Sequence, residues 1–339
     1  MVFLHGSKFL KIKTMKNNKV IDAIAPAFTA LMIEKIQNLE TEWHKLWVST
    51  AQGCPRNLAG RYYNGGNVFM LLLLTEYKKY KTPIYLTFKQ AKEAEINVKK
   101  SEKSFPVYFW YRYAMSKDKQ GKGITYEEYC HLTDEQKKKY KLVPMLKYYS
   151  VFNIDQTDMQ ETKPERYAKL LEEAENGPQT DGTACAEVDH MVEVGGWYCR
   201  IDLKSVDHAF YIPSADRIEC PTKAQFPKGA EFYSTLLHEI AHSTGHPSRL
   251  NRDMSGGFGS PSYAREELIA EMTAALCGIS FGISTTPQEE NAAYLASWLR
   301  GLKEKPEYLF DILIDANKAA TMIAERVSQS NDKADETAA

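Results

Sequence analysis

The sequence has 339 residues, of which 43% are hydrophobic and 26% are charged. This is the composition of an ordinary soluble protein, long enough for two domains. Its longest apolar run, residues 68–74, is far too short to cross a bilayer, and the N-terminus lacks the pattern of a secretory signal. No membrane partner is expected. Six cysteines without a Cys-x-x-Cys pair favour a reducing cytoplasm over a disulfide framework.

The net charge of −1 conceals two halves of opposite sign. Residues 1–150 contain 26 Lys and Arg against 13 Asp and Glu, whereas residues 151–339 contain 17 against 31. Such asymmetry predicts two bodies with different partners. The basic half could lie against a polyanion, most simply nucleic acid, although charge alone favours a set of solvated lysines.

The first half has the pattern of an α+β unit. Residues 20–50 place apolar side chains roughly on one helical face. A loop rich in Gly, Asn and Pro follows, and then a buried helix. Alternating apolar and aromatic residues then predict three strands. We expect a basic α+β nucleic-acid-binding domain over residues 16–158, with the loop at 53–66, the second helix at 68–80 and the strands at 83–89, 105–113 and 146–154.

The second half is expected to be a mainly helical domain over residues 159–327 with a small antiparallel sheet. Residues 328–339 are polar and are expected to form a disordered tail. Helical and alternating patterns predict one helix, three strands and four further helices, at residues 164–176, 191–194, 209–212, 217–219, 229–244, 263–281, 288–303 and 307–327.

The segment His238-Glu239-Ile240-Ala241-His242 carries the clearest chemistry. Residues four apart share a helical face, so His238 and His242 can present ring nitrogens to one Zn²⁺ ion. Glu239 can then act as general base on a zinc-bound water. Neighbouring apolar residues place the motif on a mostly buried helix. This spacing is typical of a zinc metallopeptidase, and the alternative is a pair of hydrogen-bonded core histidines.

A catalytic zinc needs a third protein ligand. We expect Glu267, with Glu271 orienting a histidine, because the two carboxylates share one face of an apolar helix and buried charge is costly unless paired or metal-bound. The reverse assignment stays open. His246 is the second choice, since the spacing that would make a third histidine a ligand places it at position 248, which is Ser248.

Two further residues are assigned near the start of that helix. Ser262 is expected to cap it. Glu266 is expected to be a solvated acid of the first turn.

The basic half interleaves aromatic residues with its positive charge. Bases of single-stranded DNA or RNA can stack on exposed rings while Lys and Arg contact phosphates. The loop at residues 57–67 combines glycine amides, an Arg and two Tyr, which suits such a contact as well as an ordinary turn. The residues expected to contact DNA are Trp47, Arg61, Tyr62, Tyr63, Asn67 and Trp110.

These motifs together resemble the ArdC-type antirestriction proteins of plasmids, phages and other mobile elements. The loop Gly60-Arg61-x-Tyr63-x-Gly65-x-Asn67 resembles the family's N-terminal signature. The zinc motif continues into Arg249-Leu250-x-Arg252 and Tyr263-Ala264-x-Glu266-Glu267-Leu268-x-Ala270-Glu271. The resemblance covers the chain from about residue 35 to 325. It implies a single-stranded DNA-binding domain joined to a zincin-like metallopeptidase domain, in a protein that protects incoming DNA from host restriction.

The reaction expected is peptide-bond hydrolysis of an unidentified protein substrate, with Zn²⁺ as cofactor. His246 or Tyr263 could steady the oxyanion. Two alternatives remain. The chain could be a DNA-binding protein whose zinc domain is structural or inactive, or a stand-alone cytosolic zinc peptidase with a basic surface.

Overall fold

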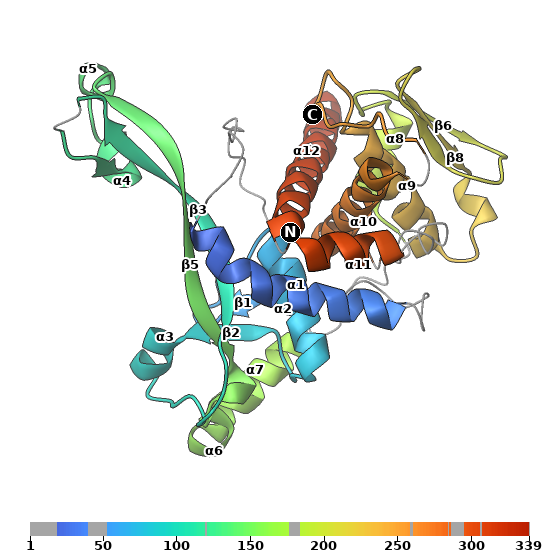
Figure 1. Cartoon of the computed structure of the whole chain (residues 1–339). Coiled ribbons are helices and arrows are strands. Elements are labelled where there is room, and N and C mark those ends of the chain that lie inside the picture. The colour runs from blue at the N-terminus through green and yellow to red at the C-terminus, as the bar shows by residue number, and fades with distance from the viewer. Residues whose placement is uncertain are drawn as a thin grey trace.

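The computed structural model describes residues 19–39, 53–118, 121–175, 184–257, 260–283, 285, 295–305 and 307–338. Within these ranges the chain forms an α+β fold of two units, as predicted (Figure 1). None of the helices in the described ranges has the length and apolar character needed to cross a membrane.

The first unit is built on a five-stranded sheet with strand order β1-β2-β5-β3-β4. β1 runs parallel to β2, and the other neighbouring strands are antiparallel. β3 pairs with β5 along its whole length, and the two strands form a ribbon that projects from the body to a tip carrying α4 and α5 (Figure 1). The bounds are Arg56–Asn57 for β1, Ile84–Thr87 for β2, Phe105–Ser116 for β3, Ile124–Thr125 for β4, Tyr140–Asn153 for β5, Tyr126–Cys130 for α4 and Asp134–Lys137 for α5.

Local capping and strand pairing decide where these strands begin and end. The strand predicted at 83–89 ends at Thr87, because the side chains of Thr87 and Gln90 form a capping box that starts α3 (Phe88–Glu93). β5 begins at Tyr140, before the predicted start at residue 146, because its pairing with β3 extends the strand to the tip. Long-range pairing of this kind leaves little trace in the local sequence pattern.

A small core beside β2 draws two more helices into the first unit. α6 (Met159–Thr162) and α7 (Pro164–Glu175) bury Met159 and Tyr167 in a cluster with Ile84. η1 (Ile154–Gln156), a turn of 3₁₀ helix, leads from β5 into them. The first unit therefore extends to Glu175, beyond the boundary predicted at residue 158.

The second unit contains a three-stranded sheet with order β6-β8-β7. β7 is antiparallel to β8, but β6 is parallel to it, so the sheet is mixed where an antiparallel one was predicted. The parallel pair forms because β7 lies between β6 and β8 in the sequence yet pairs on the far side of β8. The bounds are Arg200–Lys204 for β6, Phe210–Ile212 for β7, Arg217–Pro221 for β8 and Lys223–Gln225 for the 3₁₀ turn η2.

α8 (Ala186–Glu193) covers most of the segment at 191–194 where a strand was predicted. Its buried residues Val188 and Met191 lie three apart, which is helical spacing, and the helix packs against α12 (Glu307–Ala338). A short apolar run suits a helix as well as a strand. The packing of this segment against α12 decides in favour of the helix.

Four longer helices complete the second unit. α10 is capped by Ser260, whose hydroxyl accepts from the Tyr263 amide at 3.2 Å, and not by Ser262 as expected. Pro261 occupies the first helical position, where its missing N–H does no harm. The bounds are Gly229–Ser243 for α9, Pro261–Phe281 for α10, Leu295–Glu304 for α11 and Glu307–Ala338 for α12.

α12 continues through the segment that was predicted to be a disordered tail from residue 328. Ser330 is buried, and its hydroxyl lies so close to Gly196 that a Cβ at that position would clash with it. The side-chain amide of Asn331 donates to the Glu187 carbonyl at 3.1 Å. These contacts with the α8 region give the polar residues at the start of the segment partners that composition alone does not reveal.

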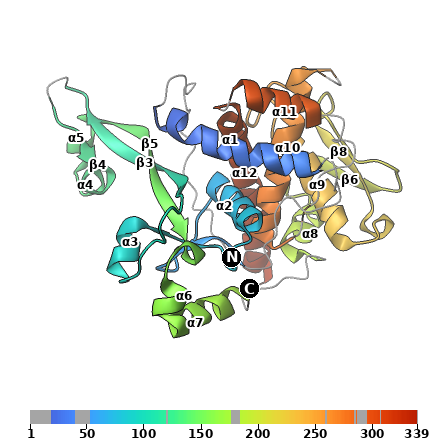
Figure 2. The same cartoon turned by 60° about the horizontal axis from the view of Figure 1, so that its bottom comes forward.

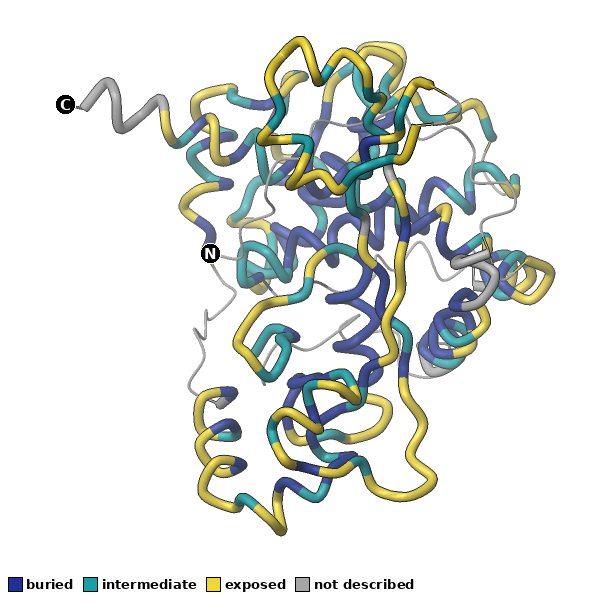
Figure 3. Tube along the Cα trace, turned by 90° about the vertical axis from the view of Figure 1, so that its left-hand side faces the viewer, coloured by how far each residue is buried: buried dark blue, intermediate teal, exposed yellow. Residues whose placement is uncertain are grey.

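One hydrophobic core runs through both units. α1 (Lys19–Leu39) lies beside α11 and α12 as well as α2 (Gly66–Lys78) (Figures 1 and 2). The Phe28 ring centroid is 5.1 Å from that of Phe105 on β3 and 5.0 Å from that of Phe310 on α12. Figure 3 shows the buried segments gathered in the interior and the exposed ones at the periphery, on loops, outer helical turns and strands. The second unit is thus held against the first by shared packing.

Replacing Phe28 by Ala is expected to lower the free energy of unfolding by about 3–5 kcal/mol, because it removes a fully buried ring. Urea denaturation followed by circular dichroism measures the change. Phe88→Ala is the matched control, since that ring is 66% exposed and its loss should change the free energy by less than about 0.5 kcal/mol. Equal stability of the two variants would contradict the shared core.

Candidate metal centre

Two buried helices bring the histidine motif and the acidic residues together. α9 carries His238, Glu239 and His242, and α10, which packs against it, carries Glu267. α9 ends in a segment that folds back on it. The Arg249 Nε donates to the Ser243 carbonyl at 2.6 Å, and the Arg252 Nη2 to the Ala241 carbonyl at 2.9 Å. Both bonds reach carbonyls of the last turn of α9, to which the Thr244 and His246 N–H groups also donate, and so fasten this segment to the end of the helix.

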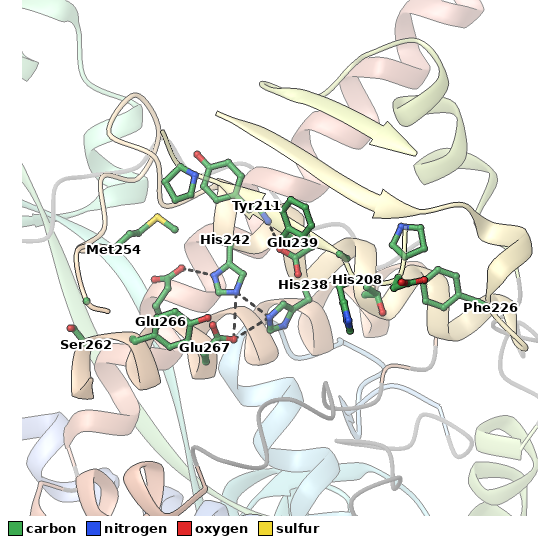
Figure 4. Close-up of a pocket in the computed structure, with 18 residues that line it drawn as sticks. His208, Tyr211, Phe226, His238, Glu239, His242, Met254, Ser262, Glu266 and Glu267 are labelled. Atoms are coloured by element: carbon green, nitrogen blue, oxygen red, sulfur yellow. Dashed lines mark hydrogen bonds and ion pairs between the residues drawn. The ribbon is translucent and has the colours of Figure 1, made fainter. Parts of the chain in front are cut away.

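Three buried side chains converge on one point (Figure 4). The Nε2 atoms of His238 and His242 are 3.0 Å apart. The Oε2 of Glu267 is 3.3 Å from the first and 3.5 Å from the second. Ligand atoms about 2.0–2.1 Å from a tetrahedral zinc lie about 3.3 Å from one another. The donor set and its spacing therefore fit such an ion.

Glu266 supports His242 from the side opposite this point. Its Oε1 is 3.3 Å from the Nδ1 of His242, and Arg252 donates to both of its oxygens, at 2.9 and 2.5 Å. The expectation that Glu266 is solvated is wrong, because it is 6% exposed. The Arg252 guanidinium compensates its charge and so permits the burial. The sequence signal was the presence of this Arg in the segment after the motif.

Glu271 faces His238 on the side away from the convergence point. Its Oε1 is 3.7 Å from the Nδ1 of His238, and that nitrogen has no hydrogen-bond partner among the described residues. The structure thus brings Glu267 to the two Nε2 atoms and Glu271 to the opposite edge of one ring. Of the two assignments weighed from the sequence, this geometry corresponds to Glu267 beside the metal position and Glu271 beside a histidine, and not to the reverse.

His246 does not join this group. Its Nδ1 lies 2.7 Å from the Ser248 hydroxyl and 3.9 Å from the Asp216 carboxylate. The chain has already left α9 at this point, and the backbone of residues 245–252 folds back along the end of the helix. Glu267 on α10, and not His246, therefore lies at the point where the two histidines meet.

Glu239 and the convergence point lie together on a cavity of about 540 Å³, a size common for ligand sites. The Oε2 of Glu239 accepts from the backbone N–H of Tyr211 on β7 at 2.7 Å. The Tyr211 hydroxyl donates to Asp216 at 2.8 Å, and Arg249 also pairs with Asp216. β7 is thereby fixed against α9. His208 and Phe226 also line the cavity (Figure 4), as do Phe210, Thr235 and Tyr263.

The charged groups of the cluster shift the pKa values of the three candidate ligands. Burial acts to lower the pKa of His242, but the carboxylates of Glu267 and Glu266 outweigh it and hold the pKa well above its usual value. The pKa of His238 is also raised, because its bond to Glu267 opposes the effect of burial. Burial would raise the pKa of Glu267, but the two histidines hold it far below its usual range. The carboxylate is thus held in its charged form, and a cation at this point would compete with protons for the two histidines.

Comparison with known proteins identifies the family. Residues 22–152 match the N-terminal domain of the anti-restriction factor ArdC, and residues 186–313 match a zincin-like metallopeptidase. The metal-free crystal structure of the antirestriction protein ArdC from plasmid R388 is 30% identical, with a TM-score of 0.63, over 92% of this chain and 99% of that one. The chain belongs to the ArdC antirestriction family.

Other relatives define the extent of the similarity. The Mn(II)-bound structure of R388 ArdC is 28% identical, with a TM-score of 0.61, over 91% of this chain and 98% of that one. An Escherichia coli DNA primase TraC is 33% identical over 291 residues, which are 85% of this chain and 26% of the primase. A second TraC is 30% identical, and the match covers 19% of its length. The chain thus spans about a quarter or less of these two curated relatives.

The residues expected to contact DNA fall into different environments in this ArdC family member. Arg61 and Tyr62 are exposed. Burial raises the pKa of the half-buried Tyr63 to about 12. The Asn67 prediction is wrong, because this residue is buried and its amide donates to the Tyr108 carbonyl at 2.5 Å and accepts from the Tyr108 N–H at 3.0 Å.

Two of the expected DNA contacts lie wholly or partly outside the described residues. Trp47 lies outside the described residues. Trp110 lies on β3, opposite Leu146 of β5, and its side chain is outside the described part.

The raised pKa values of His238 and His242 predict that metal binding releases protons. Affinity for Zn²⁺ should therefore fall as the pH falls, by about tenfold per pH unit for each proton released. Calorimetry in two buffers with different ionisation enthalpies counts the protons directly. Binding that releases no protons and keeps the same affinity at every pH would contradict the cluster as described.

Proposed function

We propose that this protein is a zinc-dependent peptidase that also binds single-stranded DNA, and that it serves as an antirestriction protein of a mobile element in the cytoplasm. The observation that carries the peptidase is the convergence of His238, His242 and Glu267 beside Glu239 in one cavity. Two imidazoles and a carboxylate with a fourth position open to solvent are the ligands typical of catalytic zinc.

His238, His242 and Glu267 would hold the metal. For such donors zinc binds more tightly than manganese in the usual order of divalent metals. When bound, zinc supplies a Lewis acid that activates water near neutral pH and polarises a peptide carbonyl. The Glu266 bond to His242 and the nearby Glu271 would fix the two ring orientations.

Glu239 is assigned as the general base. The Tyr211 N–H holds its Oε2, which leaves the other oxygen to take a proton from the attacking water and to pass it to the leaving amine. β7 is one of the two edge strands of its sheet and lines the cavity through Phe210 and Tyr211. An extended peptide could pair with this edge. Tyr263 lines the cavity and is the candidate to steady the oxyanion, whereas His246 is not among its lining residues.

The DNA-binding part of the proposal is assigned to the first unit. The positive balance of residues 1–150, the match of residues 22–152 to the ArdC N-terminal domain and the exposed Arg61 and Tyr62 support it. A basic surface with exposed rings suits single strands, whose bases can stack. The protein substrate is unidentified. The joined units would bring a peptidase to proteins that act on incoming DNA.

Glu239→Gln is expected to lower peptide hydrolysis by about 10²–10⁴-fold, because it removes the proton acceptor while the metal ligands stay in place. Cleavage of a denatured protein mixture, read by mass spectrometry, measures the loss. Glu231→Gln, on the first turn of the same helix, is the control and should keep full activity. Hydrolysis by Glu239→Gln at the wild-type rate would contradict the assignment.

The same variant separates the two activities. If protection from restriction persists in Glu239→Gln, protection depends on DNA binding and not on proteolysis. If protection disappears while zinc remains bound, proteolysis is required.

Glu267→Ala is expected to reduce bound zinc from about one ion per chain to a small fraction, since it removes one of three ligands. Glu271→Gln is the matched control on the same helix and should keep its zinc, with affinity reduced about 10–100-fold at most. Mass spectrometry of metal content after dialysis measures both. Unchanged zinc in Glu267→Ala would reject the ligand assignment.

A further inference from the structure

The ribbon of β3 and β5 carries an exposed face that the peptidase site does not use. β2 pairs only with the last three residues of β5, and β4 only with Tyr113 and Ala114. Between these points, residues 106–112 and 144–150 pair with one another alone among the described strands. This stretch forms the middle of the projecting ribbon in Figure 1.

Three aromatic rings and a lysine form a continuous strip on one face of this stretch. We call Phe109, Tyr111, Tyr149 and Lys147 the aromatic strip. Phe109 is opposite Lys147, and Tyr111 follows Phe109 on the same face of β3. The Phe109 ring centroid lies 5.6 Å from that of Tyr149, with planes at 16°, and 5.7 Å from that of Tyr111. The ammonium of Lys147 lies 4.5 Å from the Tyr111 centroid.

The rings of the strip are not core residues. Phe109 is 40% exposed and Tyr149 is 47% exposed. By contrast, the neighbouring Phe105 and Tyr108 are buried against Phe28. Exposed apolar side chains that gather in one place commonly mark a binding surface. Phe105 and Val107 share the face of the strip and are buried in the core, so the exposed rings begin where this face of the ribbon leaves the core.

The charge around the strip indicates the kind of partner. Neither β3 nor β5 contains an Asp or Glu. Lys141 and Lys147 share the face of the strip, whereas Arg112 lies on the other face and contacts Tyr126. The whole segment from residue 105 to 153 has nine Lys and Arg against five Asp and Glu. A second copy of this chain would bring the same positive ribbon. Flat exposed rings flanked by cations match a polyanion with unpaired bases.

We propose that single-stranded DNA docks along the aromatic strip, with bases stacked on Phe109 and Tyr149 and a phosphate beside Lys147. This inference rests on the proposed DNA-binding function and locates it. The ribbon, and not the loop at residues 57–67, supplies the main stacking surface. Duplex DNA is a poorer partner because its base faces are already stacked.

The test compares variants of the strip by fluorescence anisotropy with a labelled 30-nucleotide oligo(dT). Phe109→Thr/Tyr149→Thr keeps residues that favour strands and should weaken binding at least tenfold, since two stacking rings are lost. Phe88→Thr removes a ring that is 66% exposed on α3 and should leave affinity within twofold. Tyr149→Phe retains the ring and should also bind within twofold.

Lys147→Ala tests the phosphate contact without altering the rings. It should lower affinity severalfold and reduce the slope of log affinity against log salt by about 0.7. The circular dichroism spectrum of each variant should match that of the wild type. If the double variant does not fold, Lys147→Ala takes its place in the comparison with the wild type.

The outcomes separate this proposal from the function on which it rests. If the wild type binds the oligonucleotide and both the double variant and Lys147→Ala keep its affinity, the ribbon is not the docking surface. DNA binding itself then remains in place. Failure of the wild type to bind the oligonucleotide overturns both. Equal affinity for the matching duplex also overturns the proposal. A double variant that changes the sedimentation of the free protein, but not DNA binding, would assign the strip to self-association.

Discussion

The rest of the second unit depends on one costly arrangement, the burial of three carboxylates around two imidazoles. Glu266, Glu267 and Glu271 lie within two turns of α10, and each is less than 7% exposed. Burying such charge without compensation would be strongly unfavourable. His238 and His242 compensate part of it, and Arg252 compensates Glu266. A divalent cation at the point where Glu267 meets both rings would compensate the remaining negative charge. Such a cation would explain why α10 carries buried acidic residues.

The surrounding fold keeps this cluster in register. Arg249 and Arg252 attach the segment after α9 to the end of that helix, and the Tyr211 N–H ties β7 to Glu239. The shared core around Phe28 joins the same helices to the first unit. The metal centre and the proposed DNA-binding ribbon are therefore parts of one packed body, although they come from opposite halves of the sequence.

The sequence predicted what local periodicity determines. The spacing of His238 and His242 follows from one helical turn, and the pairing of Glu267 with a buried face follows from the apolar pattern of α10. The role of Glu266 was missed, because it depends on Arg252 returning along α9 through a segment with no periodic pattern. Asn67 was misassigned because its partner, the Tyr108 backbone, is 41 residues away. The parallel pairing of β6 with β8 and the exposure of the ribbon likewise depend on long-range packing.

X-ray absorption at the zinc edge of the zinc-loaded full chain tests the central claim most directly. Two imidazole nitrogens and one carboxylate should give scattering from nitrogen and oxygen at about 2.0–2.2 Å, with the outer-shell pattern of two rings. The six cysteines are all free thiols, so they provide the competing ligands. Sulfur at about 2.3 Å, or the signal of fewer than two imidazoles, would contradict a centre built from His238, His242 and Glu267.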